Sequence, residues 1–317
     1  MEPSTPNSAV PVIERHRSEA PATPAPPGRE RTAKGRALHL ALRAPRRQPT
    51  LTAAAGTLLL FLLAALLGPL LWGPDPTRVD LGSVLAAPSA AHPMGTDSLG
   101  RDVFARFLAG ARISLFVGLA VTAVGAVLGG TLGVVAGLAR GRADSLFNWL
   151  INTLLAFPPL MLAMAVAVGL GAGTLSGVLG LVIASVPWFA RVLRSEVIRI
   201  RSMPYVESAQ LLGASRTWVT LRHVVPQVVP TLVIQAAAAF GWSVLTLAAL
   251  GFIGLGPPPP TPEWGSMITD GLQYALSGQW WIGVFPGLGL LVAVTAGSVL
   301  ADRARDILDP RGSYDRI

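Results

Sequence analysis

The sequence predicts an all-α integral membrane protein with six transmembrane helices and a polar insert between the fourth and the fifth. Three observations lead to this fold class. Hydrophobic residues make up 51% of the 317 residues, only 13% are charged, and the mean hydropathy is +0.54. Soluble domains carry about twice that share of charge. Long uncharged spans recur along the chain, and nearly all of its 25 basic residues lie outside these spans.

The charge distribution points to a lipid bilayer as the surroundings of the chain. A net charge of +8 raises the question of nucleic acid, but nearly all basic residues are arginines of the N-terminal segment and of the segments between spans. This pattern follows the positive-inside rule of membrane proteins and does not resemble a phosphate-reading surface. The absence of cysteine excludes disulfides and thiolate metal sites. We expect no nucleic acid, no metal and no cofactor.

Residues 1–48 are rich in Pro, Ala and Arg and lack apolar periodicity, which predicts a disordered basic tail. A basic tail before the first span keeps the N-terminus in the cytoplasm. Leu51–Trp72 is long enough to cross a hydrocarbon core about 30 Å thick. A cleaved signal peptide is the alternative, because small residues follow, but the apolar stretch is too long and the tail too extended. We expect an uncleaved helix, in a unit of residues 49–111 that includes an extracytoplasmic loop.

That loop carries four arginines, an exception to the positive-inside rule that is tolerable where the arginines are paired. Asp97 and Asp102 are expected to be helix caps and ion-pair partners and not ligands. His92 is expected to be a loop residue and not a metal ligand, because no second histidine lies near it. The four arginines are Arg78, Arg101, Arg106 and Arg112.

The second span, Ile113–Leu138, has a glycine at every fourth position: Gly125, Gly129, Gly133 and Gly137. This spacing places the glycines on one helical face, where another helix can approach closely. The turn at 140–144 is short and basic, so it is predicted to be cytoplasmic.

Polar and proline residues interrupt the following spans. The third span, 146–169, contains Asn152 and the pair Pro158-Pro159, and the fourth, 175–193, contains Pro187. Proline breaks the backbone hydrogen-bond ladder and must be buried in protein or line a cavity. These kinks are therefore pathway candidates, with packing kinks as an equal alternative. The fifth span, 228–253, adds two polar pathway candidates, Gln235 and Ser243.

A proline-rich turn and a short helix are expected before the sixth span, 282–300. Three tryptophans near it, Trp264, Trp280 and Trp281, are expected to form an interfacial belt. Residues 112–311 are expected to form a five-helix core domain, followed by a C-terminal tail at 312–317. Counting six crossings places both termini in the cytoplasm.

The insert at 191–226 is predicted to form two short cytoplasmic helices joined by a turn. Ser202 is the expected cap of the first helix, Pro204 its opening residue and Glu207 the acidic residue that its dipole favours there. Gly213 is expected in the left-handed conformation that ends this helix, and Ser215 is expected to cap the next. Pro226 marks the start of the fifth span.

Parts of the insert resemble a known family. Glu207-Ser208-Ala209, Gly213 and Val224-Val225-Pro226 resemble the "EAA…G…I-x-L-P" loop of binding-protein-dependent ABC importer permeases. In that family the loop docks into a cleft of a separate cytoplasmic ATPase. The resemblance implies that Arg216 also belongs to the docking surface. Ser208 replaces the usual alanine with another small residue.

Two further segments resemble the dipeptide/oligopeptide/nickel branch of this family. The first, 92–115, resembles the "GTDxLGRD…SR…GARISL" entry motif. The second, 254–267, resembles "GLG…PPTPEWG". The chain ending at 309–311 resembles the "D-P-R" of the same branch. The residues of the entry motif are Gly95, Thr96, Asp97, Gly100, Arg101, Asp102 and Arg112.

The resemblance implies a type I permease fold and a permease subunit of an ATP-driven importer of peptides or of related solutes such as nickel chelates, in the plasma membrane of a prokaryote. It also implies a second homologous permease, two cytoplasmic ATP-binding subunits and an extracytoplasmic solute-binding protein as partners. The chain itself is not expected to be an enzyme, since its only lysine, Lys34, is not in a phosphate-binding P-loop motif.

Three alternatives stay open. A membrane scaffold explains the insert but not the paired prolines. An ion-coupled carrier needs ionisable residues at membrane depth, and the middles of the spans have none. The basic insert, judged by charge alone, is also consistent with a helix that lies flat on an anionic lipid surface.

Overall fold

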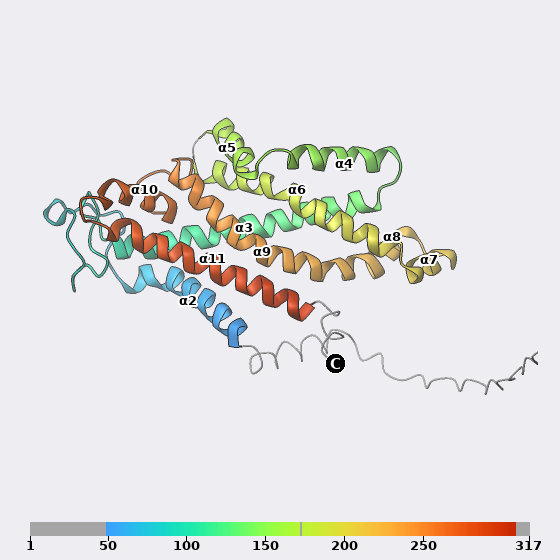
Figure 1. Cartoon of the computed structure of the whole chain (residues 1–317), viewed down its shortest axis with the longest axis horizontal. Helices are drawn as coiled ribbons and strands as arrows, with labels where there is room; N and C mark the ends of the chain where they lie inside the picture. Colours follow the sequence, from blue (N-terminus) through green and yellow to red (C-terminus); the bar gives the residue numbers. More distant parts are fainter. Residues whose placement is uncertain (1–48, 172, 309–317) are drawn as a thin grey trace, which may run out of the picture. The chain divides into compact units, whose positions relative to one another are not determined.

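The computed structural model describes residues 49–171 and 173–308, so the tails expected at 1–48 and 312–317 and the 309–311 ending lie outside this part. Among these residues, five helices are long and apolar enough to cross a membrane, and a bent pair of helices brings the number to six when the pair is counted as one span. With the pair counted in this way, the number agrees with the predicted six spans. The helices are α2 (Pro49–Leu71), α3 (Val103–Leu138), the pair α4 (Arg142–Leu155) and α5 (Pro159–Leu170), α6 (Thr174–Arg201), α9 (Val225–Phe252) and α11 (Trp281–Leu308) (Figure 1).

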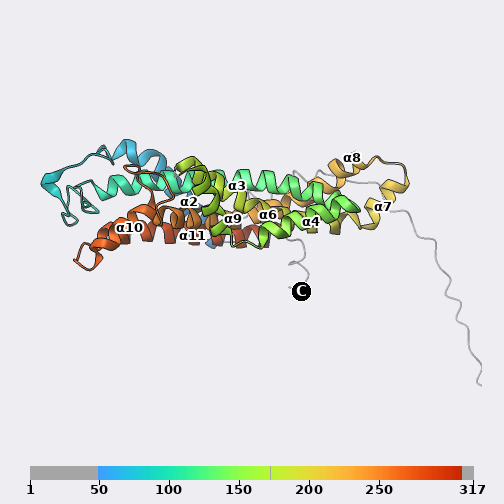
Figure 2. The same cartoon turned by 90° about the horizontal axis from the view of Figure 1, so that it is seen from above.

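Shorter elements gather at the two ends of the helix bundle. The helices α7 (Pro204–Leu211) and α8 (Arg216–Val219) lie at one end, which we call the insert end (Figure 2). The loop at 72–102, with the short 3-10 helix Leu81–Ser83, and α10 (Trp264–Ala275) lie at the other, which we call the loop end. The segments that the sequence analysis singled out are thus separated by the length of the bundle.

Two helices extend beyond the predicted spans. α3 begins at Val103 and not at Ile113, because the Asp102 carboxylate caps it by accepting the Ala105 N–H at 2.7 Å. α6 continues through the first part of the insert to Arg201. Arginines in its last turn complement the negative end of the helix dipole, which favours this extension.

The glycine face of α3 packs directly on α6. A methyl group at Gly129 would lie 2.6 Å from the Val186 carbonyl oxygen, and one at Gly133 would lie 2.7 Å from the Ala190 carbonyl oxygen. A methyl group at Gly125 would likewise overlap Ser185 of α6, and one at Gly137 would overlap Val197. The prediction of a close helix–helix contact along these four glycines is confirmed.

The third crossing is broken at its two prolines. α4 and α5 meet at an angle of 88°, with Pro158 just before α5 and Pro159 as its first residue. Because Pro159 has no N–H to donate, it fits the first turn of a new helix better than the interior of a continuous one. α5 then packs on α6, where Gly180 allows the Ala163 carbonyl to come close.

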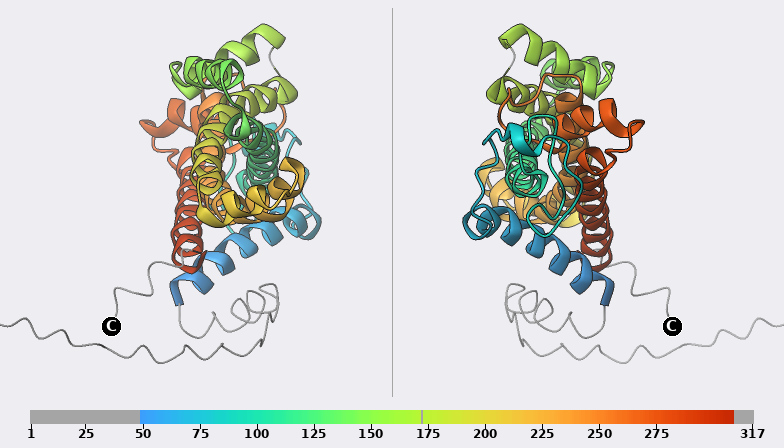
Figure 3. Two further views of the ribbon diagram at one scale, coloured as in Figure 1. Left: turned by 90° about the vertical axis from the view of Figure 1, so that its right-hand side faces the viewer. Right: turned by 90° about the vertical axis from the view of Figure 1, so that its left-hand side faces the viewer.

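α2 packs on α3 and α11. Figure 3 shows it on the side of the bundle opposite to α4 and α5. The two sides of the bundle therefore differ in composition: α4 brings charged and amide side chains and a helix break, whereas α2 is largely apolar and carries no charge.

Candidate functional site

The first insert helix, α7, follows the predicted pattern apart from its cap. Pro204 opens the helix and Glu207 lies in its first turn, while Gly213 has the positive φ of +89° that ends it. Ser208 and Gly213 are exposed, and Ala209 is half-buried. Ser208 donates its hydroxyl to the Pro204 carbonyl at 2.8 Å. The Glu207 carboxylate is exposed and makes no ion pair with the described residues.

The expectation that Ser202 caps α7 is wrong. Met203 occupies that position without a side-chain hydrogen bond, and Ser202 instead ends α6. Its hydroxyl donates to the Arg199 carbonyl at 3.0 Å, so it is already used by the preceding helix. The longer α6 therefore explains the error.

The second insert helix is continuous with the fifth crossing. Ser215 caps α8 by accepting the Trp218 N–H at 3.2 Å, as predicted, and exposed Arg216 is the first helical residue. A π-helical turn, Thr220–Val224, then joins α8 to α9. Pro226 lacks the N–H that would bond to the Arg222 carbonyl, and a widened turn relieves the clash between that carbonyl and the proline ring.

The insert is packed against the bundle. Val206 of α7 is fully buried in a cluster with residues of α6, α8 and α9. Arg201 donates from its Nη1 to the carbonyls of Gly137 and Ala139, at 2.7 and 3.2 Å, and so caps the end of α3. Arg194 pairs with Asp144 at 2.5 Å. These contacts connect the insert to α3, α4 and α6.

An apolar surface surrounds Gly213, and the sequence analysis missed it. Leu211 and Leu212 are 88% and 89% exposed, and Trp218 is 51% exposed. A groove of about 510 Å³ is lined by Leu212 and Trp218 and by residues that include Ala209, Gly213 and Ser215. A leucine pair carries no signal in a chain rich in leucine, so only the structure separates these two residues from the core. Contiguous exposed apolar side chains are typical of an interaction site.

The predicted pathway residues fall into two groups. Asn152 of α4, Pro158 and Pro159 are exposed, and Gln235 is half-buried. Pro187 is buried within α6, and Ser243 is buried and accepts a hydrogen bond from Thr122 at 3.2 Å. These last two serve helix packing in this structure. A cavity of about 320 Å³ lies beside the break between α4 and α5, lined by Pro159, Trp188 and Trp242 among others.

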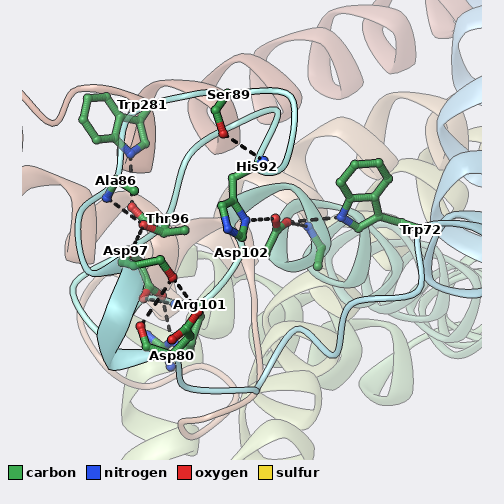
Figure 4. Close-up of polar contacts among 12 residues, drawn as sticks. Trp72, Asp80, Ala86, Ser89, His92, Thr96, Asp97, Arg101, Asp102 and Trp281 are labelled. Atoms are coloured by element: carbon green, nitrogen blue, oxygen red, sulfur yellow. Dashed lines mark hydrogen bonds and ion pairs between the residues drawn. The ribbon is translucent and has the colours of Figure 1, made fainter.

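The entry-motif residues other than Arg112 form a buried polar cluster at the loop end (Figure 4). Asp97 is 3% exposed, and its Oδ2 pairs with Arg101 Nε at 2.6 Å and with Arg106 Nε at 3.4 Å. Its Oδ1 accepts the N–H groups of Leu99 and Arg101. Removing this one carboxylate would leave two buried guanidinium groups without their ion-pair partner, and breaking a buried pair typically costs about 3–5 kcal/mol.

The rest of this cluster ties the loop to the helices. Asp102 pairs with His92 Nδ1 at 2.7 Å and accepts the Trp72 indole N–H at 3.3 Å. The Trp281 indole donates to the Thr96 carbonyl at 3.1 Å. Gly95 and Gly100 both have positive φ, and a methyl group at Gly100 would overlap the Asp80 carbonyl. The predicted capping and pairing of Asp97 and Asp102 is confirmed.

The expectation of a tryptophan belt at the loop end is wrong. Trp264 and Trp281 are buried, and of the three tryptophans only Trp280 is exposed. Trp264 stacks on Phe107 at 5.5 Å and donates to its carbonyl, because the indole fills the space between α3 and α10. Arg112 has no carboxylate partner among the described residues, so the pairing that makes a basic loop tolerable does not include it.

Glu263 is a further buried carboxylate at the loop end, outside the crossing helices. It caps α10 by accepting the N–H groups of Gly265 and Ser266, at 2.8 and 3.0 Å, and the Ser114 hydroxyl at 3.3 Å. Burial raises the pKa of the Glu263 carboxyl, and these three hydrogen bonds oppose the shift without cancelling it.

We expect the stability contribution of Glu263 to depend on pH. A raised pKa in the folded state means that the contribution is fully present below the ordinary value of 4.5 and is lost as pH rises through the folded-state value. Thermal unfolding of the wild type and of Glu263→Gln in detergent checks this. The wild-type advantage in unfolding midpoint should shrink as pH rises above 4.5, and a constant or growing difference would contradict the assignment.

Comparison with known proteins agrees with this geometry. Residues 129–314 match the family described as "binding-protein-dependent transport system inner membrane component". A probable D,D-dipeptide transport system permease of Escherichia coli is 37% identical over 263 residues, covering 83% of this chain and 88% of that protein. A dipeptide transport system permease of Alkalihalophilus pseudofirmus is 35% identical, covering 79% and 82%. A glutathione transport system permease of Shigella boydii is 39% identical, covering 73% and 76%.

A solved structure shares the fold. An inward-facing form of the MetNI methionine ABC transporter superposes with a TM-score of 0.53 and 19% identity, covering 64% of this chain and 96% of that one. The helical membrane architecture and the sequence matches point to the same family. The chain belongs to the family of binding-protein-dependent transport system inner membrane components, the permease subunits of ABC importers.

Proposed function

We propose that this chain forms half of the translocation pathway of an ATP-driven importer of small peptides. The observation that carries the proposal is the insert: an exposed acidic residue and an exposed apolar pair, Leu211 and Leu212, on helices packed against the crossing helices. The peptide class is supported by relatives named as dipeptide, peptide and glutathione permeases.

In the proposed mechanism the insert is a lever. Two cytoplasmic ATP-binding subunits close when they bind ATP, and the groove around Gly213 and the Glu207 carboxylate move with them. The contacts of Arg201 and Arg194 pass this motion to α3 and α4. The crossing helices then rock between inward-open and outward-open states. The insert end faces the cytoplasm in this arrangement, and an extracytoplasmic solute-binding protein delivers the peptide at the loop end.

The pathway is proposed to lie along α4 and its break. Asn148, Asn152 and Thr153 are exposed on α4 within an apolar crossing, and the break after Leu155 exposes irregular backbone. Neither feature is stable against lipid, because polar groups and unpaired backbone need water or protein partners at that depth. This face therefore meets water and a second permease chain, and it leads into the cavity beside Trp188 and Trp242.

A cysteine introduced at Asn152 is expected to react with a membrane-impermeant thiol reagent in intact membranes. The chain has no cysteine of its own, so a single variant reports one position. Val127→Cys on α3 is the matched control, since Val127 is 63% exposed but lies on an apolar surface. Labelling of Asn152→Cys at least about tenfold faster than Val127→Cys supports the proposed pathway face. Equal, slow labelling would place α4 against lipid.

The proposed function itself is tested by uptake. Membrane vesicles that contain the chain and the partner subunits encoded with it should accumulate a labelled dipeptide when ATP is supplied, and should not do so on an ion gradient alone. Accumulation driven by a proton or sodium gradient without ATP would favour the ion-coupled carrier. If the vesicles accumulate no peptide under either condition, the membrane scaffold is the alternative that remains.

A further inference from the structure

Arg112 is a charged residue of α3 without a partner in the part of the chain that the structure describes. It is exposed, and it makes neither a hydrogen bond nor an ion pair there. Two nearby arginines differ from it, since Arg101, just before α3, and Arg106, in its first turn, both pair with Asp97. An unpaired guanidinium on a crossing helix is costly unless an anion or water meets it.

The depth of Arg112 matches that of phospholipid phosphates. α3 has 36 residues, which corresponds to about 54 Å at 1.5 Å per residue. The hydrocarbon core of a bilayer is about 30 Å thick, so a centred helix extends about 12 Å beyond it at each end. Arg112 lies nine residues after the start of α3, or about 13 Å along it. The side chain is therefore at the boundary between hydrocarbon and headgroups.

An apolar groove runs beside Arg112 between α2 and α3. It has a volume of about 630 Å³ and is lined by Leu66 and Pro69 of α2 and by Ala109, Ile113 and Phe116 of α3. Pro76 of the loop lines the groove as well. The groove thus combines one cationic group with apolar walls. An amphiphile with an anionic head and a hydrocarbon chain matches both features.

The position of the groove in the bundle favours a lipid over a partner protein as the molecule that occupies it. α2 lies on the opposite side from α4 and α5, the face proposed to meet water and a second permease (Figure 3). Leu66 and Phe116 are 48% and 41% exposed, as expected for residues that face lipid. A carboxylate of a partner chain would have to approach from the side of α2, which carries no charged residue.

We infer that the groove between α2 and α3 binds one phospholipid molecule of the leaflet at the loop end, with its phosphate on Arg112 and an acyl chain between Leu66 and Phe116. Charge-assisted hydrogen bonds from a guanidinium to phosphate oxygens are strong and directional. The bound lipid would fasten the peripheral helix α2 to α3. This site goes beyond the proposed transport function and does not depend on which solute is carried.

Native mass spectrometry and thermal unfolding of the full-length chain in detergent test the inference, with dioleoylphosphatidylglycerol as the probe. The wild type should retain one lipid more tightly than the rest and should gain thermal stability from it. Arg112→Ala should weaken that binding about tenfold, the typical value of a hydrogen bond to a charged group. Arg112→Lys should keep part of it, and Ala109→Phe should weaken it by filling the groove while leaving the charge in place.

The controls separate the sources of the effect. Arg78→Ala removes an exposed arginine of the same end and should bind the lipid as the wild type does. Inorganic phosphate at the same concentration should not stabilise the chain, and stabilisation equal to that of the lipid would replace a lipid site by a soluble-anion site. Unchanged lipid binding by both Arg112→Ala and Ala109→Phe would overturn the inference. Loss of a co-purifying second permease in Arg112→Ala, with lipid binding intact, would assign Arg112 to a protein contact instead.

Discussion

Replacement of Glu207 by lysine is expected to abolish peptide uptake while the protein still inserts into the membrane. Glu207 is exposed in the first turn of α7 and has no partner among the described residues, so its carboxylate is available to a basic group of the ATP-binding subunit. Inverting the charge places two like charges at the contact, which costs about 2–5 kcal/mol, or a fall in uptake of about a hundredfold. Uptake of a labelled dipeptide into ATP-loaded vesicles measures the effect.

The control for this prediction is Glu196→Lys, which makes the same change of charge on α6. Within residues 49–171 and 173–308, Glu196 pairs with Arg199 alone, three residues later, and such surface pairs contribute about 0–1 kcal/mol. Uptake should therefore stay near the wild-type value in Glu196→Lys. Glu207→Gln should fall between the two. Normal uptake by Glu207→Lys, at equal protein level in the membrane, would remove the docking role from α7.

Replacement of Gly133 by leucine is expected to prevent α3 from packing on α6. A Cβ atom at this position would lie 2.7 Å from the Ala190 carbonyl oxygen and 2.8 Å from Leu193 Cβ. The carbonyl belongs to the α6 backbone, so relief requires that the two helices separate. Overpacking costs about 1–3 kcal/mol when side chains can shift, and we expect a loss above that range here. The midpoint of thermal unfolding in detergent, followed by size-exclusion chromatography, measures it.

Gly56→Leu provides the matched control for Gly133. Gly56 lies in α2 with no atom within 4 Å of an added Cβ, so the same substitution should leave the unfolding midpoint unchanged. Gly133→Ala should show an intermediate loss. If Gly133→Leu and Gly56→Leu unfold at the same temperature, the glycine face does not hold the bundle together.

The features that could be predicted from the sequence are those set by local physics. Apolar length predicts the six crossings, and the four-residue spacing of glycines predicts the close face of α3. Gly213 and Ser215 end and start helices through their own backbone and side chain, so their roles in the insert were also predictable. The prediction that Ser202 caps α7 is wrong because α6 continues beyond its apolar part, and no local signal in the sequence marks that extension.

Features that depend on distant contacts could not be predicted. Pro158 and Pro159 indicate a break, but the angle of 88° follows from how α5 packs on α6. Arg201 caps α3 across the bundle, and Trp281 donates to Thr96 from the other end of the sequence. The burial of Trp264 depends in the same way on Phe107. Exposure of Leu211 and Leu212 becomes visible only when the core is known.

Photo-crosslinking from the insert tests most directly whether an ATP-driven subunit docks there. Leu212→Cys, in a chain with no other cysteine, accepts a benzophenone maleimide at an 89% exposed position in the groove around Gly213. Illumination of the complete transporter in membranes should join this chain to the ATP-binding subunit, and Glu207→Lys should suppress the product. Crosslinks to lipid alone, with none to an ATP-binding subunit, would contradict the proposal and place the insert on the membrane surface.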